Sequence, residues 1–141
     1  MPETTNQTSI EDLNQANFGK LPEHLGLNVV AVGEGRVVGR FRVRPDLVAH
    51  TGYLLAGVGV TLADLLCAYG VSTVWPKGAK SFTTVEVKCN FVGTAIEGEV
   101  EIAATIVHSG RTTQVWDAEI ISIGTGRRMA LFRATQMILY S

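Results

Sequence analysis

Asp64 is the residue whose type and surroundings most clearly suggest chemistry. It is the only formally charged residue between Asp46 and Lys77, and most of its neighbours are apolar. Burying a carboxylate in such a segment costs free energy unless the group is paired, protonated or used in a reaction. An acid of this kind is a candidate general base or nucleophile. No basic residue is near in the sequence, which favours catalysis over a structural acid bonded across a dimer interface.

The composition indicates one globular domain and argues against several function classes. The chain has 141 residues, 46% hydrophobic and 18% charged, with a formal net charge of −1. This length fits a single domain over residues 1–141. The charge gives no electrostatic basis for binding nucleic acid or anionic lipid. The histidines have no metal-ligand spacing, so we expect no metal and no other cofactor.

The cysteine usage and the N-terminus bear on the cellular location. Cys67 and Cys89 fall in different predicted elements and match no zinc or redox spacing. We interpret them as buried thiols in a reducing compartment. The N-terminus is polar and has no basic-then-apolar signal pattern, so the expected location is the cytoplasm.

The apolar segment around Asp64 is the element that must position it. Residues 53–75 are long enough to cross a membrane and have an aromatic residue at each end. Against a membrane span, the segment contains three glycines, and a mid-bilayer Asp costs about 3 kcal/mol. The better interpretation is a helix over residues 56–74. Because this helix is apolar all round, a sheet must cover it on all sides.

The remaining segments predict one short helix and several antiparallel strands. The short helix is expected over residues 8–18, capped by Thr8 or Ser9, and residues 1–26 form this helix and its connector. Alternating apolar runs predict a hairpin over 28–43 and strands over 81–92, 98–107, 112–123 and 127–140. Short glycine-containing links between these runs indicate antiparallel pairing.

Alternation also predicts which strand residues share a face. Val85, Val87, Cys89 and Phe91 are expected on one face of their strand, with Thr84, Glu86, Lys88 and Asn90 on the other. In the last strand, Met129, Leu131 and Met137 are expected opposite Phe132 and Ile138. The predicted fold class is therefore α+β, an antiparallel sheet wrapped around one central buried helix. Its free face and edges would invite a second copy, so we expect a homo-oligomer.

Four segments resemble the hotdog-fold acyl-CoA thioesterases, in the branch of the phenylacetic-acid-pathway and 4-hydroxybenzoyl-CoA thioesterases. AGVGVTLAD at 56–64 is similar to the family's helix-start motif, His-Gly-Gly followed by Leu-Ala-Asp or Leu-Ala-Glu. SFTTVEVKCNF at 81–91 is similar to the strand behind that helix, HSGRT at 108–112 to the turn near CoA, and MALFRAT at 129–135 to the closing strand. The resemblance extends from about residue 28 to the C-terminus.

The resemblance implies a hotdog-fold enzyme that hydrolyses an acyl-CoA thioester to a free acid and CoA. Asp64 would be general base or nucleophile, the Gly57 backbone N–H would polarise the thioester carbonyl, and Thr84 would orient water. The expected substrate-binding residues are His50, Tyr53, Leu55, Ala56, Ala68, Gly110, Arg111 and Thr112, with Arg111 near a CoA phosphate. The family's sites lie between protomers, which implies a homodimer or homotetramer.

Elementary physics supports the part assigned to Gly57. The first N–H groups of a helix are unpaired and carry partial positive charge. One such donor aimed at a developing oxyanion is worth about 3 kcal/mol. Seven residues separate Gly57 from Asp64, close to two helical turns, so both are expected on one helix face.

The sequence departs from the family motif before the helix. Leu55 replaces the usual His, Ala56 replaces the first Gly, and Ala49 stands where an Asn or Gln is expected. His50 and Thr51 are nearby polar residues that could substitute. These departures motivate an alternative hypothesis, a hotdog protein that binds acyl-CoA without hydrolysing it. A hydratase is weaker, because the helix offers no His beside the acid, and a purely structural interaction protein is the remaining alternative.

Overall fold

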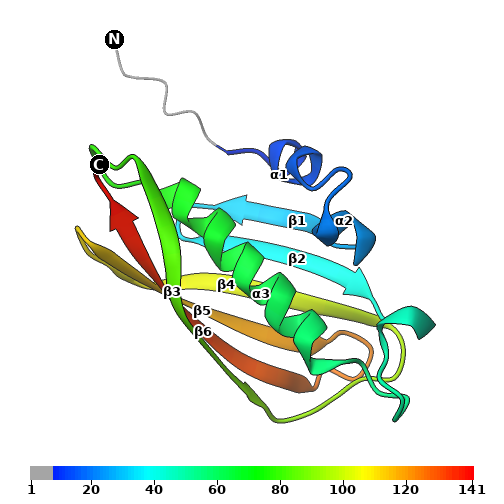
Figure 1. Cartoon of the computed structure of the whole chain (residues 1–141). Coiled ribbons are helices and arrows are strands. Elements are labelled where there is room, and N and C mark those ends of the chain that lie inside the picture. The colour runs from blue at the N-terminus through cyan, green and yellow to red at the C-terminus, as the bar shows by residue number, and fades with distance from the viewer. Residues whose placement is uncertain (1–7) are drawn as a thin grey trace.

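One long helix lies across the concave face of a six-stranded antiparallel sheet in the computed structural model, which describes residues 8–141 (Figure 1). The helices are α1 (Ile10–Ala16), α2 (Leu21–His24) and α3 (Ala56–Val71), with 3-10 turns η1 (Pro45–Leu47) and η2 (Ser72–Val74). The strands are β1 (Asn28–Gly33), β2 (Arg36–Arg42), β3 (Ser81–Phe91), β4 (Glu99–Ser109), β5 (Thr113–Ser122) and β6 (Arg128–Leu139). Their order in the sheet is β1-β2-β4-β5-β6-β3. The predicted architecture is confirmed.

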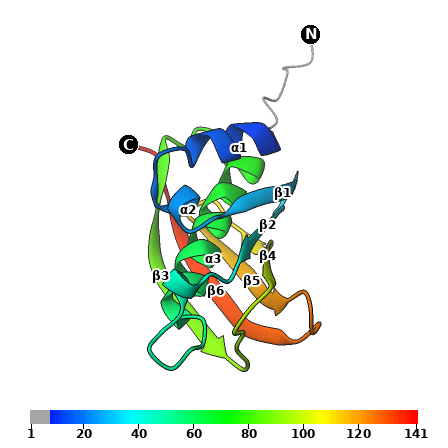
Figure 2. The same cartoon turned by 90° about the vertical axis from the view of Figure 1, so that its right-hand side faces the viewer.

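The sheet covers one side of the central helix. The cover on all sides that its composition predicts is incomplete in this chain, because Thr61 is exposed and Asp64 and Ala68 are only half-buried. Helix α3 packs on β2, β4, β5 and β6, and the sheet curves around it (Figure 2). Its side chains at Leu62, Ala63, Leu66 and Cys67 are fully buried. With η2 it is the one helix of residues 8–141 that is long and apolar enough to cross a bilayer. Because the sheet covers it, this helix is the core of the fold and not a membrane span.

The N-terminal segment covers one edge of the sheet. Ser9 and Asp12 form the capping box that starts α1, in agreement with the predicted cap. The Asn14 side chain accepts a hydrogen bond from the N–H of Val29 at 2.9 Å and donates one to its carbonyl at 3.1 Å. This pair of bonds imitates a neighbouring strand at the edge of β1. The connector contains one feature not predicted, the single-turn helix α2, whose start accommodates Pro22.

A bulge in β3 corrects the predicted faces of that strand. The pairing with β6 shifts between Thr84 and Glu86, so Val85 is an extra residue in the ladder. Thr84 pairs with the buried Gln136 and therefore faces α3, not the outer side with Glu86 as alternation predicted. Val87, Cys89 and Phe91 also pair with inward residues of β6, so Thr84 shares their face. The prediction was wrong because one inserted residue inverts every side chain before it.

A second bulge corrects the predicted face of Met129. Ile120 pairs with Ala130, whereas Ile121 pairs with Arg128, so Met129 is the extra residue. Its side chain is buried, although alternation placed it with the exposed Leu131 and Met137. Phe132 and Ile138 face the core as predicted.

Gly70 allows close packing between α3 and the sheet, and this predicts a matched pair of stability effects. A Cβ at Gly70 would lie 2.4 Å from two ring carbons of the buried Trp116, whereas one at Gly57 meets nothing within 4 Å. Overpacking a core costs about 1–3 kcal/mol, while Gly→Ala in an open helical position gains up to about 1 kcal/mol. In denaturant unfolding, Gly70→Ala should be less stable than Gly57→Ala by about 1–3 kcal/mol. Equal stabilities would contradict the packing described.

Candidate active site

Asp64 lies in the middle of α3, where the edge strand β3 passes over the helix. Its side chain is half-buried, and within residues 8–141 no basic side chain pairs with it. The Thr84 hydroxyl lies 3.5 Å from Asp64 Oδ1, at the limit of a hydrogen bond. Burial raises the pKa of Asp64, and the Thr84 hydroxyl lowers it in part. A raised pKa suits a carboxylate that accepts a proton during a reaction.

Thr84 connects Asp64 to the sheet. The same hydroxyl donates to Gln136 Oε1 on β6 at 2.8 Å. Gln136 is fully buried, and the pairing of β3 with β6 places it directly opposite Thr84. The structure therefore brings Asp64 and Thr84 together as the sequence suggested, and adds Gln136, which sequence reasoning missed. A single Gln in a closing strand carries no signal before the bulge is known.

Gly57 is the second residue of α3 and presents an unpaired backbone donor. Among the described residues its N–H donates to no acceptor, and no side chain caps this helix. The residue is exposed, with open space in front of its Cα. A carbonyl oxygen can therefore approach this N–H directly, and the helix dipole favours negative charge at that point.

A small apolar pocket opens beside this helix start. Its volume is about 170 Å³, and it is lined by Leu54, Leu55, Ala56, Gly59, Phe91, Gly93, Thr94, Ile120 and Met129. Leu55 and Ala56 were predicted to contact substrate, and the structure places both here. Phe91, Ile120 and Met129 were not predicted, because the bulge brings Met129 inside and the other two belong to distant strands. The pocket can hold an apolar group at the first turn of α3, to which Gly57 belongs.

The remaining predicted residues lie in other places. His50 and Tyr53 are exposed in the loop before α3, and Ala68 is half-buried one turn beyond Asp64. Gly110, Arg111 and Thr112 form the β4–β5 turn, at the end of the sheet away from the start of α3 (Figure 1). There Arg111 stacks on the Tyr140 ring at 5.1 Å, and the Tyr140 hydroxyl donates to its carbonyl.

A larger groove, about 610 Å³, lies on the outer face of the sheet. It is lined by Arg36, Lys88, Asn90, Ala103, Thr105, Asp117, Ala118, Glu119, Leu131, Phe132 and Arg133. Three of its charged residues are already paired. Arg133 binds Asp117 through two hydrogen bonds of 2.6 and 2.9 Å, and Glu119 binds Arg128 at 2.9 Å. The groove shares no residue with Asp64, Thr84 or Gly57, so we place the chemistry on the helix side of the sheet.

Gly57 and Asp64 are well separated along α3. Seven residues of helix, at 1.5 Å rise each, separate Gly57 from Asp64 by about 10 Å. A carbonyl polarised by an N–H and attacked by a water held on a carboxylate needs both groups within about 3 Å of the reacting atoms. The two groups lie on one face of one helix but are too far apart to serve one thioester.

Comparison with known proteins identifies the family. The chain matches the Thioesterase superfamily over residues 51–128. A 1,4-dihydroxy-2-naphthoyl-CoA hydrolase from Listeria monocytogenes is 30% identical over 100 residues, covering 71% of this chain and 80% of that protein. A thioesterase structure from Haemophilus influenzae has a TM-score of 0.87 at 24% identity, covering 96% of this chain and 93% of that one. A mutant thioesterase from Pseudomonas aeruginosa also reaches 0.87 at 24% identity, over 94% of each chain.

These structures are hotdog-fold thioesterases, so the fold predicted from the sequence is confirmed. The chain belongs to the Thioesterase superfamily. It is a thioester hydrolase, as the names of its relatives and the resemblance of its motifs both indicate.

The raised pKa of Asp64 makes a prediction about stability against pH. The folded protein holds the Asp64 proton more tightly than the unfolded chain, so the ionised carboxylate destabilises the fold above the folded-state pKa. This penalty disappears once pH falls below the ordinary Asp value of about 4. Asp64→Asn should therefore raise Tm at about pH 7, and the gain should vanish near about pH 3.5. A difference in Tm that does not change with pH would contradict this environment.

Proposed function

We propose that the protein hydrolyses an acyl-CoA thioester to a free acid and CoA, with Asp64 as the catalytic carboxylate. The observation that carries this proposal is the half-buried, unpaired Asp64 on α3, within reach of the Thr84 hydroxyl. The Listeria relative is a CoA-ester hydrolase, which supports CoA thioesters as the substrate class. No step of the proposed reaction needs a metal or a redox cofactor.

The chemistry follows from the groups in place. As general base, Asp64 takes a proton from a water that Thr84 helps to orient, and the water oxygen bonds to the thioester carbon. The carbonyl oxygen becomes negative and is stabilised by the N–H of Gly57. The C–S bond then breaks, the proton passes from Asp64 to the sulfur, and acid and CoA leave. If Asp64 instead attacks the thioester carbon directly, the C–S bond breaks, CoA leaves as a thiolate and an acyl-aspartate anhydride forms. Water then hydrolyses the anhydride to the free acid and the Asp64 carboxylate, and the proton released from that water neutralises the CoA thiolate.

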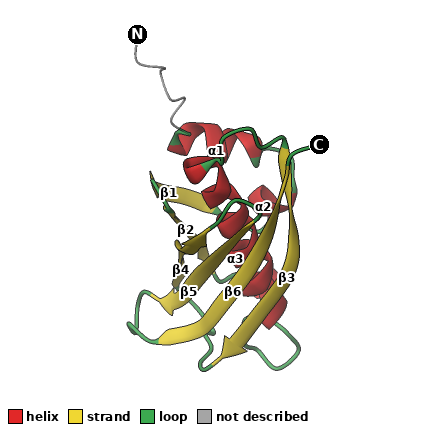
Figure 3. Ribbon diagram, turned by 90° about the vertical axis from the view of Figure 1, so that its left-hand side faces the viewer, coloured by secondary structure: helices red, strands yellow, loops and turns green. Residues whose placement is uncertain are grey.

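The 10 Å separation along α3 supports a site shared by two protomers. Strand β3 is a free edge of the sheet, on the side opposite β1 (Figure 3). It exposes Val85, Val87 and Phe91, each at least 44% accessible. Antiparallel pairing of two β3 strands would cover these side chains and bring the two α3 helices near each other. Gly57 of one protomer would then serve the same thioester as Asp64 of its partner.

The pocket beside Gly57 is the proposed place of the acyl group. Its walls are almost entirely hydrocarbon, and Tyr53 stands exposed in the loop leading to it. A cavity of about 150 Å³ with similar apolar walls accommodates benzene, so this pocket suits an acyl group of about that size. Arg111 and His50, which lie outside this pocket, would contact the polar part of CoA. Ala68 would contact the substrate from the α3 helix of the partner protomer.

Turnover should depend on the Asp64 carboxylate. Free-thiol release from short, medium, long and aromatic acyl-CoAs should be measured for the wild type and for Asp64→Asn. The substitution keeps the shape but removes the base, so kcat should fall about 100-fold or more. Tight binding of acyl-CoA without any turnover by the wild type would instead favour the non-catalytic alternative that Leu55 motivates.

Mixing subunits that carry different substitutions tests whether the site is shared by two protomers. Gly57→Pro removes the N–H in the first helical turn, where proline is tolerated, and Asp64→Asn removes the base. In a mixed dimer of the two variants, one site carries both defects and the other carries neither. Because one of its two sites is intact, the mixed dimer should have about half the activity of the wild-type dimer. If both groups of a site came from one protomer, the mixture would stay inactive; thermal unfolding checks that each variant folds.

A further inference from the structure

Gln136 is a buried polar residue for which packing gives no reason. It is fully buried on β6, between Thr84 on β3 and Gln114 on β5 in the strand register. Its neighbours on that side of the same strand, Ala134 and Ile138, are apolar and buried. Burying an amide there costs free energy unless its groups are bonded. Within residues 8–141 its Nε2 has no hydrogen-bond partner, whereas Oε1 accepts from Thr84.

The second glutamine of this row is explained by the fold. Gln114 is also fully buried, but its Nε2 donates to the Val74 carbonyl at 3.1 Å. Its Oε1 accepts from the Trp116 indole at 2.9 Å. Gln114 therefore ties the end of α3 to β5. The Gln136 side chain makes no such structural bond in the described part of the chain, where its one partner is the hydroxyl that also reaches Asp64.

The Thr84 hydroxyl has one proton and therefore serves one acceptor at a time. When it donates to Gln136 at 2.8 Å, it has none for Asp64 at 3.5 Å. Rotating the Gln136 amide by 180° exchanges its oxygen and nitrogen without moving the side chain. Nε2 then donates to Thr84 Oγ1, and the Thr84 proton turns to the carboxylate. The atom left without a partner is then a carbonyl oxygen, a less costly orphan than an N–H.

We propose that Gln136 is a positioning residue of the hydrolysis, whose amide N–H donates to Thr84 Oγ1 and directs the Thr84 proton to Asp64 Oδ1. This inference rests on the proposed function of Asp64. The bulge at Val85 supports it, because the bulge turns Thr84 onto the helix side of β3, opposite Gln136. The chain Gln136–Thr84–Asp64 joins the rigid sheet to the reacting group, so the carboxylate receives its hydrogen bond in one fixed direction.

The test is a double-mutant cycle with Gln136→Met and Thr84→Val. Gln136→Met keeps the volume and removes the amide, so the fold should retain or gain stability. If Gln136 acts through Thr84, Gln136→Met should lower kcat about tenfold, the effect of one hydrogen bond, and leave KM unchanged. The double variant should then be no slower than Thr84→Val alone. Full activity of Gln136→Met, or effects that multiply in the double variant, would overturn the proposal.

A second readout does not depend on turnover. The carboxyl carbon of Asp64 can be titrated by NMR in the wild type and the three variants. The Thr84 hydroxyl lowers the pKa of Asp64, so losing its direction should raise that pKa in Gln136→Met, and no further in the double variant than in Thr84→Val. If Gln136 instead competed for the Thr84 proton, its removal would lower the pKa of Asp64. An unchanged or lowered value overturns the proposal.

The control for loss of a buried amide is Gln114→Met, which should lower Tm but leave both kcat and the Asp64 titration near wild type. Cys67, one turn along α3, interacts electrostatically with Asp64. Burial, and then the charges of Asp64 and Asp117, raise the pKa of Cys67, so it stays a neutral thiol during the titration. Should no acyl-CoA be hydrolysed, the proposed function fails, and the titration still decides whether Gln136 directs Thr84.

Discussion

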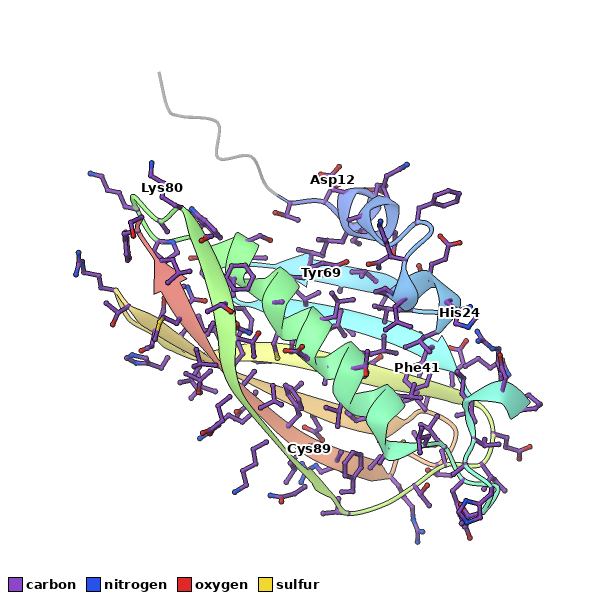
Figure 4. All side chains as sticks on the ribbon, in the orientation of Figure 1. Asp12, His24, Phe41, Tyr69, Lys80 and Cys89 are labelled. Atoms are coloured by element: carbon purple, nitrogen blue, oxygen red, sulfur yellow. The ribbon has the colours of Figure 1, made fainter. Side chains whose placement is uncertain are left out.

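The structure depends on one constraint, which is that a helix apolar on every side must be covered on every side. Helix α3 has no wholly polar face to give to water, so the sheet bends around one side of it and α1 packs beside the edge strand β1. Tyr69 on α3 donates to Asn17, just after α1, and so fixes that cover (Figure 4). The side of α3 that carries Thr61, Asp64 and Ala68 stays at least partly exposed. The glycines of α3 are part of the same solution, because Gly70 lies where the ring of Trp116 packs.

Asp64 lies where α3 is only partly covered. Asp64 is on the side of α3 that faces the edge strand, so it is half-buried and not sealed in. A carboxylate fully enclosed in this core would stay protonated, and one on an open surface would behave as an ordinary acid. Beside the strand edge, Asp64 is only partly buried. The Thr84 hydroxyl can orient the carboxylate there, and water can still reach it. The position therefore combines a raised pKa with access, which general base catalysis needs.

Much of the fold could be predicted from the sequence, because composition and alternation are strong signals over long segments. The helix around Asp64, the first hairpin and four long strands were all found, with ends within a few residues. The bulges at Val85 and Met129 could not be predicted, because one extra residue leaves no mark in a pattern of period two. That failure hid the inward position of Thr84, the burial of Met129 and the contact of Gln136. Asp64, whose charge stands alone, was evident, whereas its partners depend on pairings between strands far apart in sequence.

The two edges of the sheet differ, and this has a consequence for how copies of the chain can associate. At β1 the Asn14 amide occupies the N–H and carbonyl of Val29 that an incoming strand would use. At β3, the other edge strand, no side chain of residues 8–141 bonds the backbone in this way. A sheet open on both sides can add copies without end, as a fibre does, whereas a sheet open on one side is saturated by one partner. In an assembly built through sheet edges, Asn14 would therefore limit each chain to one partner, although it lies far from Asp64.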